Sequence, residues 1–160
     1  MTQAPDFALK NEEGVIASLA ELRGDKPFLL LFSRFEDCPT TRRDLLDYGN
    51  VYDRLEMLGV GMAAVTVDTV PNHRKLKRDL GVPFPLLSDP DFSVSESYGV
   101  YRSDETDHGP QPHGEPAVFI VDVDGNLVYS QVSSAPKGLA HPAELTLMLL
   151  YMVRNGGRYW

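Results

Sequence analysis

The sequence contains a single cysteine, Cys38, among its 160 residues. One thiol cannot close an intrachain disulfide, so a disulfide-stapled scaffold is excluded. A chain of this length can bury a continuous core without such staples, and we expect one domain spanning residues 1–160. Residues 1–10 lack the basic start and the long apolar run of a secretory signal, which favours a reducing cytoplasm.

Long hydrophobic runs are also missing from the sequence. The longest apolar stretches, at 28–32 and 145–153, are far shorter than the roughly 20 residues that a membrane-spanning helix needs. Positive charge is scarce, because 15 Lys and Arg face 23 Asp and Glu and give a formal net charge of −8. A surface of that sign repels phosphate backbones, so we expect neither a membrane nor a nucleic acid as partner. The dense basic run at 73–78 is typical of a solvated helix face.

Several catalytic motifs are absent as well. The sequence has no Gly-rich phosphate loop, no dinucleotide fingerprint and no Gly-x-Ser-x-Gly elbow, so nucleotide enzymes and hydrolases lack support. His108 and His113, with Asp104, Glu105 and Asp107, could in principle bind a metal. The prolines, glycines and acids of 102–115 instead predict a surface loop, and we expect neither a metal nor a bound cofactor. The two other histidines, His73 and His141, are predicted at the surface or as helix caps.

Short apolar strands alternate with amphipathic helices along the chain. The predicted elements, in order, are an N-terminal hairpin at 6–17, a helical turn from Ser18, a strand at 28–32, a helix at 39–58, a strand at 62–67, a helix from Asn72 to Gly81, an extended segment at 84–87, a helix ending at Gly99, a hairpin at 117–132 and a helix at 142–156. This order predicts an α/β fold whose central mixed sheet carries helices on both faces. The aromatic tail at 158–160 is expected to dock on its own domain, with docking on a partner subunit as the alternative.

Cys38 lies where the predicted strand at 28–32 has ended and the next helix begins at Pro39. Open α/β sheets place their sites at the carboxyl ends of strands, and a helix start offers unpaired N–H groups and a positive dipole end. Both effects favour the thiolate, which is the nucleophilic form. Arg34 and Arg42 could each add positive charge. The alternative is an inert buried thiol, since free cysteine is among the most buried residue types.

The segment 32–43, FSRFEDCPTTRR, resembles the AhpC/TSA family of peroxiredoxins and their redoxin relatives. It is similar to the branch with the pattern Phe-x-Arg, three variable residues, then Cys-Pro-x-Cys-Arg. The segments at 81–90, 97–100 and 115–126 resemble the middle and late regions of the family, so the resemblance covers most of residues 5–150.

This resemblance implies a thioredoxin-like fold in which Pro116, expected as a cis-proline, packs beside Cys38. It also implies a thiol peroxidase that reduces hydrogen peroxide or an organic hydroperoxide, with Cys38 as the peroxidatic residue. Helix-start N–H groups and an arginine, Arg34 or Arg42, would stabilise the departing oxygen. Related proteins often pair, so a homodimer is expected.

Three positions depart from the family pattern. Thr41 stands where close relatives carry a second cysteine, Phe35 where typical members carry threonine, and Pro116 where many carry the catalytic arginine. Without a second cysteine, recycling needs an external thiol, either a small thiol or a thioredoxin-like protein. The Thr41 hydroxyl could bond either the thiolate or the backbone.

Two other functions remain open from the sequence. A monothiol thiol–disulfide oxidoreductase is favoured by Thr41 and Pro116. A redoxin scaffold without turnover, acting as an interaction or sensor module, is favoured by Phe35 and the missing second cysteine.

Overall fold

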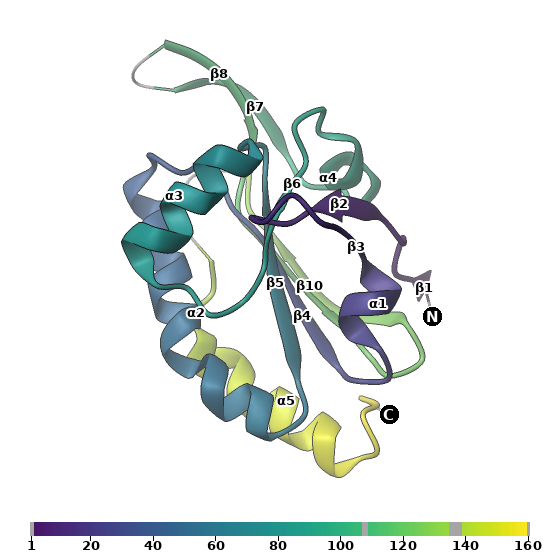
Figure 1. Ribbon diagram of the computed structural model, residues 1–160. Coiled ribbons are helices and arrows are strands. Elements are labelled where there is room, and N and C mark those ends of the chain that lie inside the picture. The colour runs from purple at the N-terminus through teal and green to yellow at the C-terminus, as the bar shows by residue number, and fades with distance from the viewer. Residues whose placement is uncertain (1, 107–108, 135–138, 160) are drawn as a thin grey trace.

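The computed structural model describes residues 2–106, 109–134 and 139–159. Its strands are β1 (Thr2–Gln3), β2 (Ala8–Lys10), β3 (Ile16–Ser18), β4 (Phe28–Phe32), β5 (Gly61–Thr66), β6 (Leu86–Ser88), β7 (Arg102–Thr106), β8 (Gly109–Gly114), β9 (Ala117–Val121) and β10 (Asn126–Val132). Its helices are α1 (Leu19–Arg23), α2 (Pro39–Met57), α3 (Val70–Leu80), α4 (Ser93–Ser97) and α5 (Pro142–Arg154). Eight strands form one sheet in the order β1-β10-β9-β4-β5-β6-β2-β3 (Figure 1).

The centre of this sheet is mixed, as the sequence predicts. β4 runs parallel to β5 and antiparallel to β9. All five residues of β4 are buried, which explains its uninterrupted apolar run. Successive side chains of a strand point to opposite faces, so Leu29 and Leu31 join one core cluster while Phe28, Leu30 and Phe32 join another.

Helices cover both faces, which confirms the predicted fold class. The cluster around Leu29 and Leu31 includes buried residues of α2, α3 and α5, whereas the cluster on the opposite face includes Leu19 of α1 and the rings of Phe92 and Tyr98. Figure 1 shows the same division, with α2, α3 and α5 on one side of the sheet and α1 and α4 on the other. Tyr98 and Phe119 extend the aromatic packing around Phe32, at centroid distances of 5.4 and 5.6 Å from its ring.

The pairing of β4 with its two neighbours places three chain segments at one edge of the sheet. Phe32 pairs with Val65 of β5 on one side and with Ala117 of β9 on the other. The residues after Phe32, the residues after Thr66 and the residues before Ala117 therefore meet at this edge. Cys38 lies in the first of these segments, at the start of α2.

The start of α3 differs from the prediction. Thr69, rather than Asn72, is the N-cap, and its hydroxyl accepts the Asn72 N–H. The predicted end is confirmed, since Gly81 caps the helix at φ 66°, a left-handed conformation that glycine adopts without strain.

The sequence predicts a surface loop over 102–115, and this prediction is wrong for most of that range. β7 and β8 form an antiparallel hairpin, with Arg102 paired to Gly114, that projects from the body at the top of Figure 1. The prolines and glycines of β8 hide the alternation of apolar and polar residues that predicts a strand. The hairpin still forms because an edge strand can contain prolines that donate no backbone hydrogen bond. Asp107 and His108 lie outside the described residues.

The prediction for His73 is also wrong, because its side chain is fully buried on α3. The imidazole lies between the hydroxyls of Thr66 and Ser88, at 2.6 and 3.1 Å. These two partners satisfy both ring nitrogens and make the buried position tenable. The prediction for His141 is confirmed, since its side chain caps α5 by accepting the Ala143 N–H.

The C-terminal residues pack on the same chain, as expected. Arg158 makes a two-point ion pair with Asp124, at 2.7 and 3.1 Å. The Tyr159 ring packs edge-on against Tyr151. Trp160 lies outside the described residues.

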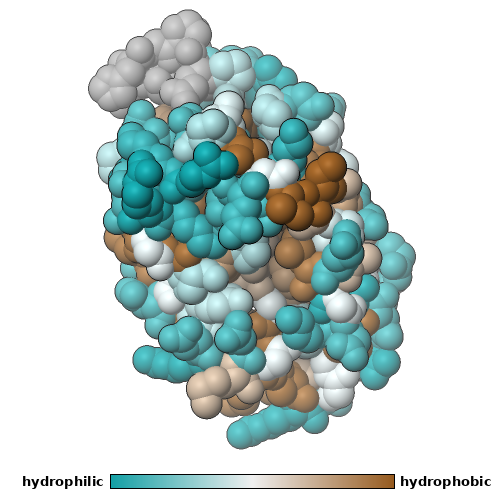
Figure 2. Space-filling view, in the orientation of Figure 1, coloured by the Kyte–Doolittle hydropathy of each residue, from teal (hydrophilic) through white to brown (hydrophobic). Residues whose placement is uncertain are grey.

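The surface is mostly hydrophilic on the face that carries α3. Figure 2 shows this polar area and, beside it, a hydrophobic patch over β2 and β3. Val15 and Ile16, at the open β3 edge, are both more than half exposed. Within the described ranges, no helix is long and apolar enough to cross a membrane.

Candidate active site around Cys38

Cys38 is the N-cap residue of α2. Its backbone is extended, with φ −75° and ψ 122°, and Pro39 opens the helix behind it. The Cys38 N–H donates to the Phe35 carbonyl at 3.1 Å, and the Arg42 N–H donates to the Cys38 carbonyl at 3.1 Å. The residue is 4% exposed, so its sulfur is held in a fixed, nearly dry position.

The surroundings of the sulfur favour the thiolate. Burial raises the pKa of the Cys38 thiol, but the backbone N–H of Thr41, the Arg34 guanidinium and the Thr40 N–H lower it. The net result is a pKa below the ordinary cysteine value. The helix start therefore acts as the sequence predicts, and it does so together with one of the two candidate arginines.

Arg34 is the arginine that reaches the sulfur. Its Nη1 atom lies 3.4 Å from the Cys38 Sγ. Its Nε and Nη2 atoms lie 3.3 and 3.1 Å from the Nε2 atom of His113. Nε is also 3.4 Å from the Oε2 atom of Glu115, and the guanidinium carbon lies 5.3 Å from the Phe35 ring centre. Arg34 is thus contacted on several sides.

Thr41 contributes through its backbone and its hydroxyl in different ways. Its N–H lowers the pKa of Cys38, as described above. Its hydroxyl accepts the backbone N–H of Arg34 at 3.1 Å. The second of the two predicted options, a bond to the backbone, is therefore the one observed for the hydroxyl. Thr41 is buried, so this bond fixes the start of the Arg34 side chain relative to α2.

Arg42 is directed elsewhere. Its Nε donates to the Glu36 carbonyl at 2.7 Å, and its Nη2 donates to the Glu36 carboxylate at 2.9 Å. A further contact joins Nη2 to Asp79 at 3.7 Å. The Arg42 guanidinium thus stabilises the loop before Cys38.

The expectation of a cis peptide bond before Pro116 is wrong. No described peptide bond is cis, so the bond before Pro116 is trans. Pro116 is buried where β9 begins, and its carbonyl accepts the Ser133 N–H at 2.9 Å. It therefore opens the strand as an ordinary residue would.

His113 and Glu115 are the functional candidates that sequence reasoning missed. His113 was considered only as a metal ligand, and Glu115 only as part of the family resemblance. Both side chains are buried and contact Arg34. The sequence did contain a signal: His113 and Glu115 directly precede the apolar strand at 117–121. Residues in that position lie at a strand end, close to the predicted site around Cys38. In the described part of the chain, no group of three or more His, Cys, Asp or Glu side chains could hold a metal.

Asp68 is a further buried carboxylate at this sheet edge. It accepts the Thr66 hydroxyl at 2.6 Å, and the Glu36 N–H also lowers its pKa. Burial is the largest effect and raises the pKa of Asp68 to about 6. Asp68 thereby connects the end of β5 to the loop that precedes Cys38.

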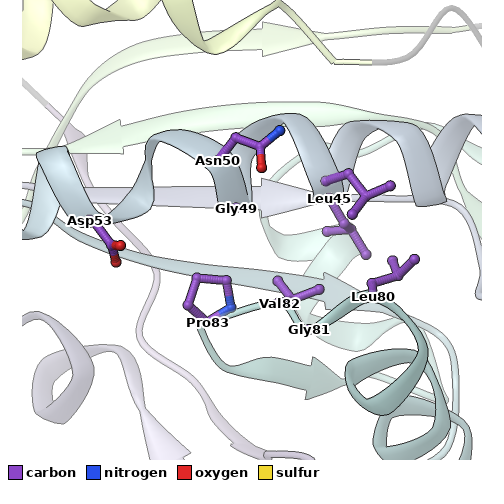
Figure 3. A pocket seen from close by; sticks show the side chains of 9 residues that line it. Leu45, Gly49, Asn50, Asp53, Leu80, Gly81, Val82 and Pro83 are labelled. Carbon is purple, nitrogen blue, oxygen red and sulfur yellow. The ribbon is translucent and has the colours of Figure 1, made fainter.

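Two cavities lie away from the sulfur. One of about 230 Å³ separates α2 from the segment that follows α3, and Figure 3 shows Leu45, Asn50 and Pro83 around it. A larger one of about 680 Å³ lies beside β2, β6 and the start of α3. Cys38 lines neither of them.

The profile of the AhpC/TSA family matches residues 1–130. The chain belongs to this peroxiredoxin family. A Coxiella burnetii protein named as a peroxiredoxin, bcp, is 33% identical over 144 residues, which are 89% of this chain and 93% of the relative. That relative agrees with the family assignment over nearly the whole length of both proteins.

Solved structures support the thioredoxin-like peroxiredoxin fold. The crystal structure of the peroxidoxin BcpB from Mycobacterium tuberculosis superposes with a TM-score of 0.78 at 20% identity, and the match covers 96% of this chain and 94% of that one. A structure of the Xanthomonas campestris bacterioferritin comigratory protein gives a TM-score of 0.74 at 16% identity, over 94% and 92% of the two chains.

Proposed function

We propose that this peroxiredoxin is a thiol-dependent peroxidase that uses Cys38 as its only redox-active residue. The observation that carries the proposal is the contact between Arg34 Nη1 and the Cys38 sulfur, at 3.4 Å, at the N-terminus of α2. Together with the backbone N–H of Thr41, this contact lowers the pKa of the thiol against the effect of burial, and it places a cationic donor next to the position that a peroxide must occupy to react.

The reaction transfers one oxygen atom to the sulfur. The Cys38 thiolate attacks the nearer oxygen of the O–O bond, the S–O bond forms and the O–O bond breaks. The cysteine becomes a sulfenic acid, and the leaving oxygen takes a proton to become water or an alcohol. The N–H groups of Arg34 stabilise the negative charge that develops on that oxygen.

Recycling requires two equivalents of an external thiol. The first thiol condenses with the sulfenic acid, releasing water and forming a mixed disulfide on Cys38. The second thiol attacks that disulfide, restores the Cys38 thiol and leaves as a disulfide with the first. Cys38 is the only cysteine of the chain, so the reductant is a small thiol or a thioredoxin-like protein.

Organic hydroperoxides are proposed as substrates together with hydrogen peroxide. The support is the alkyl peroxide reduction described for the Xanthomonas campestris relative. The alternative of thiol–disulfide exchange rested partly on a cis-proline at position 116, and the trans bond removes that support.

The test is the rate at which hydrogen peroxide consumes the Cys38 thiol, followed by intact mass with a sulfenate trap. Because this is the only thiol of the chain, the mass change reports on one residue, and Cys38→Ser is the control. We expect a rate orders of magnitude above that of free cysteine at the same pH. A rate equal to free cysteine would leave only disulfide exchange or a scaffold without turnover.

The assembly and setting are also proposals. Residues 1–160 are proposed to act as one domain in a reducing cytoplasm, where the external thiol is available. A homodimer is proposed, supported by the exposed Val15 and Ile16 at the β3 edge. Light scattering after size-exclusion chromatography, with Ile16→Lys as the variant, tests it, and a wild-type monomer at all concentrations would refute it.

A further inference from the structure

The Arg34 side chain is held in place by residues far from it in sequence. His113 lies one residue before the end of β8, and Glu115 directly follows that strand; they are 79 and 81 positions after Arg34. Both reach Arg34 because β9, which starts at Ala117, pairs with β4, which ends at Phe32. The segment that carries Arg34 and Cys38 and the residues just before β9 therefore lie side by side and contact each other.

All three nitrogens of the guanidinium have polar neighbours in this arrangement. Nη1 faces the Cys38 sulfur, while Nη2 lies 3.1 Å from His113 Nε2. Nε lies between His113 Nε2 at 3.3 Å and Glu115 Oε2 at 3.4 Å. The planar shape of the guanidinium couples these contacts, so anchoring Nε and Nη2 fixes the direction of Nη1.

The Glu115 carboxylate is almost completely buried, which costs free energy of folding unless its charge is compensated. Its side chain is 3% exposed, and its Oε2 has no hydrogen-bond partner among the described residues. Its Oε1 lies 3.2 Å from His113 Nε2. A buried carboxylate destabilises a fold unless a cation compensates it, and Arg34 is the cation beside Oε2.

His113 is packed as firmly as Glu115. Its ring is fully buried and lies edge-on to Phe35, with ring centres 5.1 Å apart. Phe35 in turn lies under the Arg34 guanidinium. Phe35, which departs from the family pattern, thus packs against the remaining side of the Arg34 guanidinium.

We propose that Glu115 and His113 are positioning residues that act on Cys38 through Arg34. They direct Nη1 at the sulfur and, in the peroxidase reaction, at the leaving oxygen. This inference rests on the proposed function for its catalytic meaning, but its effect on the thiol can be measured without any peroxide.

The experiment is a double-variant cycle on the reactivity of the Cys38 thiol. Wild type, Glu115→Gln, Arg34→Gln and the double variant are compared by the pH dependence of thiolate ultraviolet absorbance and of alkylation by iodoacetamide. Glu115→Gln removes the contact to Nε and also a negative charge near the thiolate, and the loss of charge alone would lower the thiol pKa. We expect the loss of the directed Nη1 contact to outweigh it, so that alkylation at neutral pH slows by about two- to tenfold, the range of one hydrogen bond, and the titration midpoint moves to higher pH. In the Arg34→Gln background only the charge effect remains, so the same change should not slow alkylation further.

Two more variants make the result specific. His113→Phe keeps a ring against Phe35 but removes the Nε2 acceptor, and it should change the titration in the same direction. Glu12→Gln neutralises a buried glutamate that pairs with Lys77, away from the sulfur, and should leave the titration unchanged. Additive effects of Glu115→Gln and Arg34→Gln, or an unchanged titration in both Glu115→Gln and His113→Phe, would overturn the proposal. A wild-type peroxide rate equal to that of free cysteine would instead refute only the peroxidase function.

Discussion

Replacing Arg34 by glutamine is expected to slow the reaction of Cys38 with hydrogen peroxide by about tenfold to 150-fold. The contact between Nη1 and the sulfur is a hydrogen bond from a charged donor, and such bonds contribute about 1.5 to 3 kcal/mol. Since about 1.4 kcal/mol corresponds to a factor of ten, that range converts directly into the expected loss of rate. The Arg34 side chain is only 15% exposed, so solvent screens this interaction weakly.

Arg42→Gln is the matched control for this measurement. Arg42 belongs to the same segment and has the same charge, but its guanidinium bonds to Glu36. Stopped-flow measurement of the peroxide rate across pH should therefore show a large loss for Arg34→Gln and a small one for Arg42→Gln. If Arg34→Gln stays within twofold of wild type, or if both variants lose the same amount, a specific role for Arg34 is wrong.

Three further outcomes are expected. Thr41→Val leaves the Arg34 N–H without its hydroxyl acceptor, and urea unfolding should show a loss of about 1–3 kcal/mol; an unchanged midpoint would contradict this. Burial raises the pKa of Asp44 to about 6 despite the bond from the Leu139 N–H, so its contribution to stability is present below pH 4 and is lost as pH rises through 6. Relative to Asp44→Asn, wild type should lose about 2 kcal/mol between pH 4 and pH 8, and parallel urea curves would refute this. Burial lowers the pKa of His73 to about 4, so its NMR signals should report a neutral ring at pH 5.5, and a midpoint near 6.5 would contradict the burial.

Elements with strong local signals were predictable from the sequence. The apolar run of β4 and the start of α2 at Pro39 lie where they were expected, because burial on both faces and a proline at a first helical position leave direct marks on the sequence. Those two elements alone place Cys38 at a helix start. The position of the thiol at the centre of the candidate site was therefore predictable.

Features set by tertiary contacts were not predictable in the same way. His73 reads as one of several polar residues on an exposed helix, and only its two hydroxyl partners on β5 and β6 make a buried imidazole stable. The β7–β8 hairpin has a composition typical of a loop. The choice between Arg34 and Arg42 also depended on partners elsewhere, since Glu36 binds one and the segment before β9 binds the other.

The pairing of β4 with β9 brings the segment that carries Arg34 and the segment that carries position 116 to the same edge of the sheet. Phe32 and Ala117 are register partners, so the residue two positions after Phe32 and the residue just before Ala117 both lie at the edge of the sheet where Cys38 sits. We therefore expect that an arginine from either strand end could approach the same thiol. Here Arg34 comes from the β4 side, and the β9 side supplies Glu115, a carboxylate that holds it. Pro116→Arg should then add little to the peroxide rate of the wild type but should rescue part of the rate lost in Arg34→Gln. If the Pro116→Arg/Arg34→Gln double variant is no faster than Arg34→Gln, the two strand ends are not equivalent.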